Sequence, residues 1–167
     1  MRLDILEYCG EDECQEELFV DECFDDCLLG ITCIGSWSFT PAYDFNKMID
    51  YIKKNNNLSE SEAIEHFNLN ILDKKPKIAF VRYVNESNMV LSEYNEDMLF
   101  LDGFDNALVG IRIQKDYDMV AVYEDNKCIS ILIDNDGMDE EEAIEYFEYN
   151  VRGSYVGEHT PALLTLF

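Results

Sequence analysis

Residues 141–161, EEAIEYFEYNVRGSYVGEHTP, combine the first turns of an amphipathic helix with a glycine break and a polar turn. The first half of this stretch has an earlier counterpart at residues 61–70, SEAIEHFNLN. Asp139 and Glu142 have the spacing of a capping box, in which each side chain accepts the other residue's backbone N–H. The apolar stripe at helical spacing contains Ala143, Ile144, Phe147 and Val151. The pattern predicts a helix that begins after Asp139 in this copy and after Ser59 in the earlier one.

The similarity between the two copies extends well beyond this helix. When the chain is shifted by 80 residues, positions 24–70 match positions 104–150 with 17 identities over 47 positions and no gap. We interpret this match as a tandem duplication. A period of 80 residues is too long for a solenoid repeat and has the size of a small domain or half-domain.

Each copy has the pattern of two strands, two helices and a further strand. A glycine, Gly30 or Gly110, lies in the middle of the first strand, which indicates a bulge or a close backbone approach. Asp44 and Asp125 are the expected N-caps of the first helix in each copy. We therefore expect an α+β fold in which two similar halves pack as a pseudo-two-fold pair. The expected organisation is an acidic N-terminal extension at 1–20, a first repeat at 21–83, a connector at 84–100 and a second repeat at 101–167.

The charge of the chain narrows the class of partner. The 167 residues contain 36 acidic and 12 basic side chains, for a net charge of −24, with 47% hydrophobic and 13% aromatic residues. That apolar content indicates a folded protein and not a disordered acidic tail. Because an acidic chain repels nucleic acid, we expect no direct nucleic-acid binding and favour a basic protein surface as the partner of a monomer or homodimer.

The densest acidic run lies near the N-terminus and is the expected contact set for that partner. Its members are Glu11, Asp12, Glu13, Glu16, Glu17, Asp21 and Glu22. The alternative is that this run is a solvated face with no partner.

The remaining composition predicts no cofactor, no metal site and no membrane span. The first residues lack the apolar run of a signal peptide, and the sequence holds no stretch of eighteen apolar residues, so we expect a cytoplasmic protein. The six cysteines lack the C-x2-C pair typical of zinc sites. Free buried thiols are the favoured interpretation, with a metal site and disulfides as alternatives.

One polar cluster resembles an enzyme site. It consists of Tyr155, Glu158, His159 and Thr160. A histidine beside a carboxylate is a candidate general base or metal ligand. However, sequence neighbours on an extended segment point to opposite sides. The favoured interpretation is a structural turn, with partner contact and catalysis as alternatives, and no catalytic residue is assigned.

Three segments of the second copy carry a resemblance to a known group of proteins. They are FDNALVGI at 104–111, YEDNKCISIL at 123–132 and DEEEAIEYFEYNVRGSYVGEHTP at 139–161. The pattern FD-x-A-x-x-G, EEA-x-E-Y/F and YVGE-x-TP resembles small uncharacterised proteins of bacteriophages and their hosts. The first copy matches as far as Asn70 and lacks the YVGE-x-TP ending. The resemblance implies a phage origin, and hence the host cytoplasm, but no mechanism.

Three hypotheses about function follow. The first is a non-catalytic acidic binding protein of phage type that inhibits a host nucleic-acid-acting or defence enzyme by charge mimicry, as a DNA mimic does. The second is a small hydrolase or metal-dependent enzyme built on the turn at Glu158 and His159. The third is a regulatory module that binds a small ligand between the repeats.

Overall fold

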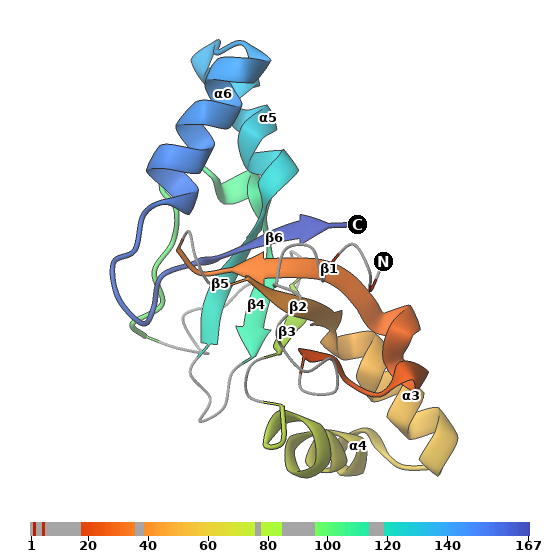
Figure 1. Ribbon diagram of the computed structural model, residues 1–167. Coiled ribbons are helices and arrows are strands. Elements are labelled where there is room, and N and C mark those ends of the chain that lie inside the picture. Colours follow the sequence, from red (N-terminus) through yellow and green to blue (C-terminus); the bar gives the residue numbers. More distant parts are fainter. Residues whose placement is uncertain are drawn as a thin grey trace.

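The fold is mixed α and β, and its centre is a closed six-stranded barrel (Figure 1). The computed structural model describes residues 2, 5, 18–35, 39–75, 78–84, 96–113 and 119–167. In chain order the strands are β1 (Leu28–Cys33), β2 (Phe39–Asp44), β3 (Ala79–Tyr83), β4 (Leu108–Ile113), β5 (Met119–Glu124) and β6 (Ala162–Leu166). Each strand pairs with the next, and β6 closes the barrel against β1. The pairs β2–β3 and β5–β6 are parallel, whereas the other pairs are antiparallel.

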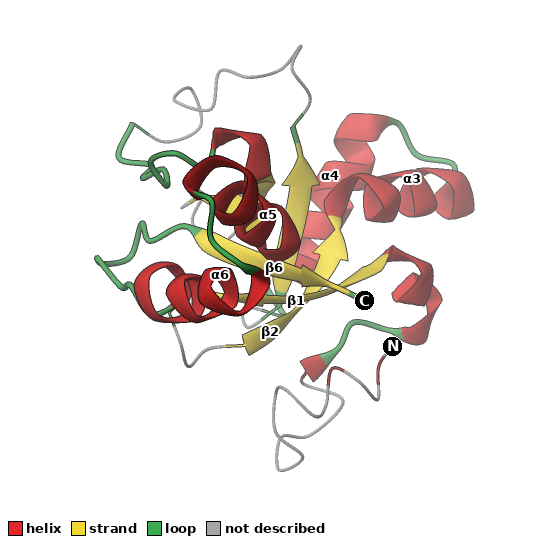
Figure 2. Cartoon of the chain, turned by 90° about the horizontal axis from the view of Figure 1, so that it is seen from above, coloured by secondary structure: helices red, strands yellow, loops and turns green. Residues whose placement is uncertain are grey.

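Helices join the strands of each parallel pair, because strands that run in the same direction need a crossover. The first crossover consists of α3 (Phe45–Asn56), α4 (Glu60–Phe67) and the π-helical turn η2 (Asn68–Leu72). The second consists of α5 (Asp125–Asp136), α6 (Glu140–Tyr146) and the π-helical turn η7 (Phe147–Arg152). Short 3-10 helices, η1 (Glu22–Cys27) and η5 (Asp105–Ala107), precede β1 and β4. The two helix pairs lie on different sides of the barrel (Figures 1 and 2).

Strand alternation separates an inner core from two outer cores. The inner core consists of small and branched side chains, namely Ala42, Ala79, Val81, Val109, Val120, Val122, Ala162 and Leu164. The outer core beside α3 and α4 includes Phe67 and Phe80, whose ring centroids lie 4.9 Å apart. The outer core beside α5 and α6 includes Ile111 and Phe147. Phe67 and Phe147, which match under the 80-residue shift, are both fully buried.

The two mid-strand glycines occupy bulges, as the sequence predicted. The register shifts between Leu28 and Gly30 and again between Leu108 and Gly110. A Cβ on Gly30 would lie 2.0 Å from the carbonyl oxygen of Thr165, and one on Gly110 would lie 2.3 Å from a backbone oxygen of the neighbouring strand β3. Only glycine allows the strands to approach this closely.

The predicted helix ends are confirmed. Asp139 Oδ1 accepts the Glu142 backbone N–H at 2.9 Å, and Glu142 Oε2 accepts the Asp139 N–H at 3.3 Å. Ser59 forms the corresponding capping box with Glu62 at the start of α4. Asn57 and Gly137 end α3 and α5 in the left-handed conformation, with φ values of 53° and 69°.

The structure also corrects two predictions about the helices. Asp44 caps α3 by accepting the Lys47 N–H at 3.0 Å, but Asp125 caps nothing, because it lies inside α5 as a buried residue. Ile144 was expected in the buried stripe of α6 and is instead 42% exposed. The residues of α6 and η7 that are buried, Ala143, Phe147 and Val151, are four apart, so Ile144 lies on the flank of a narrower stripe.

Three of the cysteines predicted to be buried thiols are buried and unpaired. Burial raises the pKa of Cys27 to about 11 and the pKa values of Cys33 and Cys128 to about 12. Cys23 is exposed, contrary to the prediction. Cys9 and Cys14 lie outside the described residues.

These thiols should differ sharply in reactivity. At neutral pH we expect iodoacetamide to label Cys23 in the native protein and to leave Cys33 and Cys128 unmodified, because their thiolate fractions are lower than that of an ordinary thiol by on the order of a hundredfold or more. Peptide mapping by mass spectrometry measures this, and a urea-unfolded sample should show labelling at every cysteine. Equal labelling rates for Cys23 and Cys128 in the native protein would contradict the burial.

Candidate functional site

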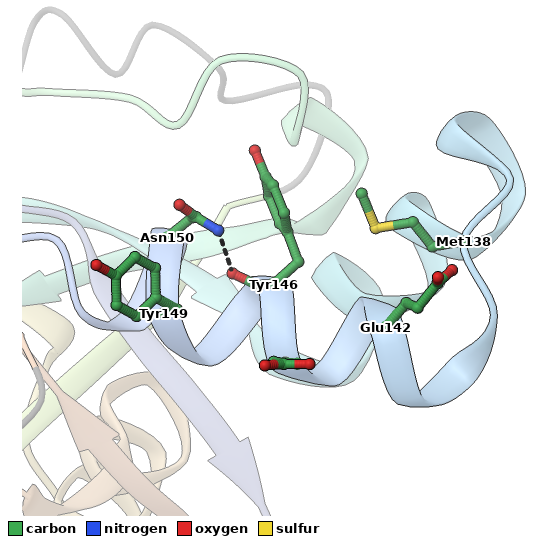
Figure 3. Close-up of a pocket in the computed structure, with 6 residues that line it drawn as sticks. Met138, Glu142, Tyr146, Tyr149 and Asn150 are labelled. Atoms are coloured by element: carbon green, nitrogen blue, oxygen red, sulfur yellow. Dashed lines mark hydrogen bonds between the residues drawn. The ribbon is translucent and has the colours of Figure 1, made fainter.

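The outer face of α6 and η7 carries exposed tyrosines among carboxylates. A shallow pocket of about 450 Å³ on this face is lined by Met138, Glu142, Glu145, Tyr146, Tyr149 and Asn150 (Figure 3). Tyr149 is 82% exposed and Tyr146 is 43% exposed. We call these six residues the acid–tyrosine face. The notebook of features expected from sequence alone placed the helix tyrosines in a core or interface, and this face places two of them at the surface.

Helical spacing explains why these side chains gather on one side. Glu142, Tyr146 and Asn150 are four residues apart and form one row along the helix, and Glu145 and Tyr149 form the adjacent row. In Figure 3, Tyr146 and Met138 extend on the same side of the helix. The side chains that pack into the core come from the remaining side of the same helix. The acid–tyrosine face is therefore the surface that the buried stripe leaves in solvent.

The π-helical turns give a physical role to the asparagines that match in the two copies. Asn150 Nδ2 donates to the carbonyl oxygen of Tyr146 at 3.2 Å (Figure 3), and Asn70 Nδ2 donates to that of His66 at 3.0 Å. Each asparagine thus bonds a carbonyl near a helix end, as expected from sequence. π-Helical turns often occur at functional sites, which draws attention to η7.

A buried ion pair fixes η7 to the rest of the molecule. The Arg152 guanidinium donates to Asp125 Oδ2, and the Thr165 hydroxyl donates to the same oxygen. Arg152 also pairs with Glu148 at 3.0 Å and lies over the Phe147 ring, 5.3 Å from its centroid. Because these residues come from α5, η7 and β6, the contacts hold the acid–tyrosine face on a rigid base.

Burial is the largest influence on the carboxyl group at the centre of this cluster. Asp125 is 4% exposed, and burial raises its pKa, while the Thr165 hydrogen bond and the Arg152 charge oppose the rise. The sequence gave little sign of this pairing, since the partners are 27 and 40 residues away. The 80-residue shift would have marked it: the positions that match Asp125 and Arg152 are Phe45 and Leu72, which have no charge.

The enzyme-like cluster forms a hydrogen-bonded turn. The buried Thr160 hydroxyl donates to the Gly157 carbonyl oxygen at 2.6 Å and accepts the Val156 N–H at 3.0 Å. Tyr155 is 63% exposed, Glu158 is exposed, and His159 is partly exposed. The Thr160 side chain is thus directed into the loop, whereas Tyr155 and Glu158 face solvent. The geometry supplies a structural role for Thr160, and the catalytic hypothesis for Glu158 and His159 stays a prediction.

Most of the predicted acidic contact set falls outside the described residues. This applies to Glu11, Asp12, Glu13, Glu16 and Glu17. Asp21 and Glu22 are described and exposed, at the start of η1. Beside them, Arg2 Nε donates to Asp25 Oδ1 at 2.8 Å, which fixes Arg2 against η1.

Comparisons with known proteins leave the site to be interpreted from its own chemistry. A scan against protein-family models found no match, and searches of curated proteins and of solved structures found no significant match. In the part of the chain that the structure describes, no helix has the length and apolarity needed to cross a bilayer. Within the same residues, no three histidine, cysteine, aspartate or glutamate side chains cluster as metal ligands would.

Proposed function

We propose that this protein is a non-catalytic acidic binding protein that docks on a basic surface of another protein through its acid–tyrosine face. The observation that carries the proposal is the exposure of Tyr146 and Tyr149 beside Glu142 and Glu145 on a helix held by a buried ion pair. Exposed tyrosines are common in protein interfaces, and their ring faces attract lysine and arginine. Carboxylates between the rings favour the same cations.

The kind of partner follows from the charge of the whole chain. A net charge of −24 opposes compaction, so a basic partner would relieve self-repulsion as well as form local contacts. Nucleic-acid-acting enzymes present basic surfaces of this kind. Together with the resemblance of residues 104–161 to phage proteins, this supports a phage-encoded inhibitor of a host nucleic-acid-acting or defence enzyme, acting by charge mimicry. The N-terminal acidic run would then extend the contact.

We also propose that the barrel consists of two similar halves related by an approximate two-fold axis. Several pairings support this: β1 pairs Leu28 with Tyr43, and β4 pairs Leu108 with Tyr123, each 80 residues later. The hydroxyl of Tyr43 accepts the Val20 N–H at 3.3 Å, and that of Tyr123 accepts the N–H of the residue 81 positions later in the chain, Leu101, at 3.1 Å. In this proposal the acid–tyrosine face belongs to one half alone, since His66 and Leu69 occupy the positions of the two tyrosines in the other.

Truncating the tyrosines tests the binding proposal. The full chain is first used to capture a partner from host lysate at low salt, and the affinity of the purified pair is then measured by titration calorimetry. We expect Tyr149→Ala to weaken binding roughly thirtyfold, because truncating an anchoring interface tyrosine costs about 2 kcal/mol. Leu69→Ala is the matched control, since Leu69 occupies the corresponding position in the first copy and is 58% exposed. Equal affinity for wild type and a folded Tyr149→Ala variant would exclude this face from the interface.

A second arm separates the acid–tyrosine face from the acidic run. Four residues of the run, Glu11, Asp12, Glu16 and Glu17, are replaced by glutamine or asparagine. If the run contributes, association slows and its dependence on salt becomes shallower, because fixed charges accelerate encounter and salt screens them. Unchanged association with an unchanged salt slope would assign the run to the solvated surface and leave the contact to α6 and η7.

A further inference from the structure

Arg112 points into the apolar interior of the barrel. Its strand neighbours in β4, Ile111 and Ile113, both belong to the outer cores, so strand alternation turns Arg112 to the opposite face. The residues paired with it across the sheet are Val81 on β3 and Val120 on β5. Both valines belong to the inner core. The Arg112 stem therefore lies between two aliphatic side chains.

Among the described residues, this buried charge has no counter-charge. Arg112 is 7% exposed, and its Nε atom is buried without a hydrogen-bond partner. Burial lowers the pKa of Arg112 to about 10, so the side chain is still charged at neutral pH. Arg2 and Arg152, by contrast, are each paired with an aspartate.

An unpaired guanidinium in an apolar interior is costly, and an anion would offset that cost. Nε and an adjacent Nη can bind two oxygens of one planar group side by side. We propose that Arg112 is the anchor of a binding site for a small monocarboxylate, whose anionic end pairs with the guanidinium. The exposed 7% of the residue is the surface that such an anion would reach from solvent.

The surroundings favour a carboxylate over a phosphate. A monocarboxylate brings one negative charge and two acceptor oxygens, which a single guanidinium satisfies. A phosphate would bring further oxygens and charge, and neither Val81 nor Val120 offers a donor for them. The short apolar end of a carboxylate such as acetate would fit beside the aliphatic side chains.

Two measurements on the full chain test this site, with sodium formate and sodium acetate as the probes and sodium chloride at equal ionic strength as the reference. The chloride series is needed because salt screens the self-repulsion of a chain with a net charge of −24 and stabilises every variant. The first measurement follows the Arg112 Nε–H resonance by 15N NMR, assigned by its loss in Arg112→Lys. The second is the melting temperature of wild type, Arg112→Met and Arg112→Lys. Arg82→Met, on the adjacent strand β3, is the matched control.

The proposal predicts a saturable shift of the Arg112 Nε–H resonance with formate and acetate and a small linear drift with chloride. At a concentration of one hundred times the dissociation constant, the melting temperature of wild type and of Arg82→Met should exceed that in chloride by about 5–10 °C. Arg112→Met should show no such excess. In chloride it should be at least as stable as wild type, because it removes an unpaired buried charge and keeps a similar volume.

Either of two results would overturn the proposal. One is identical behaviour of the resonance and of the melting temperature in carboxylate and chloride. The other is a large loss of stability in Arg112→Met in chloride, which would mean that the chain itself already neutralises this charge. If Arg112→Met does not fold, the NMR titration of wild type decides the question.

Discussion

Replacing Gly110 by alanine is expected to cost more than about 3 kcal/mol of stability, at the upper end of what overpacking a core costs. The new Cβ would lie 2.3 Å from the Arg82 carbonyl oxygen, and the obstacle is backbone that belongs to the paired strand β3. The strands could separate only by breaking their ladder, which joins the two halves of the barrel. Gly30→Ala should behave in the same way, since its Cβ would lie 2.0 Å from the Thr165 carbonyl oxygen on β6.

Gly137→Ala is the control that separates steric overlap from loss of glycine flexibility. Gly137 has a φ of 69° at the end of α5, and a Cβ there would meet nothing within 4 Å. Its replacement should cost about 1–2 kcal/mol, the usual penalty for a left-handed residue with a side chain. Urea unfolding followed by circular dichroism gives all three values. A Gly110→Ala midpoint equal to that of Gly137→Ala would show that β3 and β4 do not approach as closely as described.

Local sequence patterns predicted much of the fold because local physics determines those features. The capping boxes at Ser59 and Asp139 depend on residues three positions apart, and the bulges at Gly30 and Gly110 appear as glycines inside apolar runs. The mixed α and β class follows from the same alternation and helical spacing. None of these features requires knowledge of which strands become neighbours.

Barrel closure could not be predicted in this way. It depends on pairing between β1 and β6 and between β3 and β4, which are far apart in sequence or separated by a long connector. Alternation states which face of a strand is buried but not which strand lies beside it. The charged interior position of Arg112 was missed for the same reason: on a strand with one apolar face, a charged residue is ordinarily assigned to solvent.

The acid–tyrosine face was missed because helical spacing alone does not give the width of the buried stripe. Tyr146 and Tyr149 flank Phe147 in sequence, and a wider stripe would have buried both of them. Their exposure depends on how much of the helix the barrel covers. The role of Asp125 failed differently: an acid at a helix start is usually a cap, and its true partner, Arg152, approaches only after η7 turns the chain back toward β6.

Removing the Arg152 side chain should be the second large effect, about 3–5 kcal/mol for Arg152→Met, the usual cost of breaking a buried ion pair from one side. The change leaves the Asp125 carboxylate buried with the Thr165 hydroxyl as its remaining donor among the described residues. Lys127→Met is the matched control. Lys127 pairs with Glu124 at 2.9 Å but is half exposed, so its loss should cost less than about 1 kcal/mol.

The dependence on pH and a second substitution identify the cause of that loss. The pKa of Asp125 is already raised by burial, so ionising it favours the unfolded state, and stability falls as pH rises through that pKa. Without Arg152 the pKa should rise further, so the deficit of Arg152→Met should shrink on the acid side of neutrality, where Asp125 is protonated and neutral. Asp125→Asn in the Arg152→Met background should recover much of the lost stability at neutral pH. A deficit that is constant with pH and unrelieved by Asp125→Asn would instead assign the loss to the packing of Arg152 over the Phe147 ring.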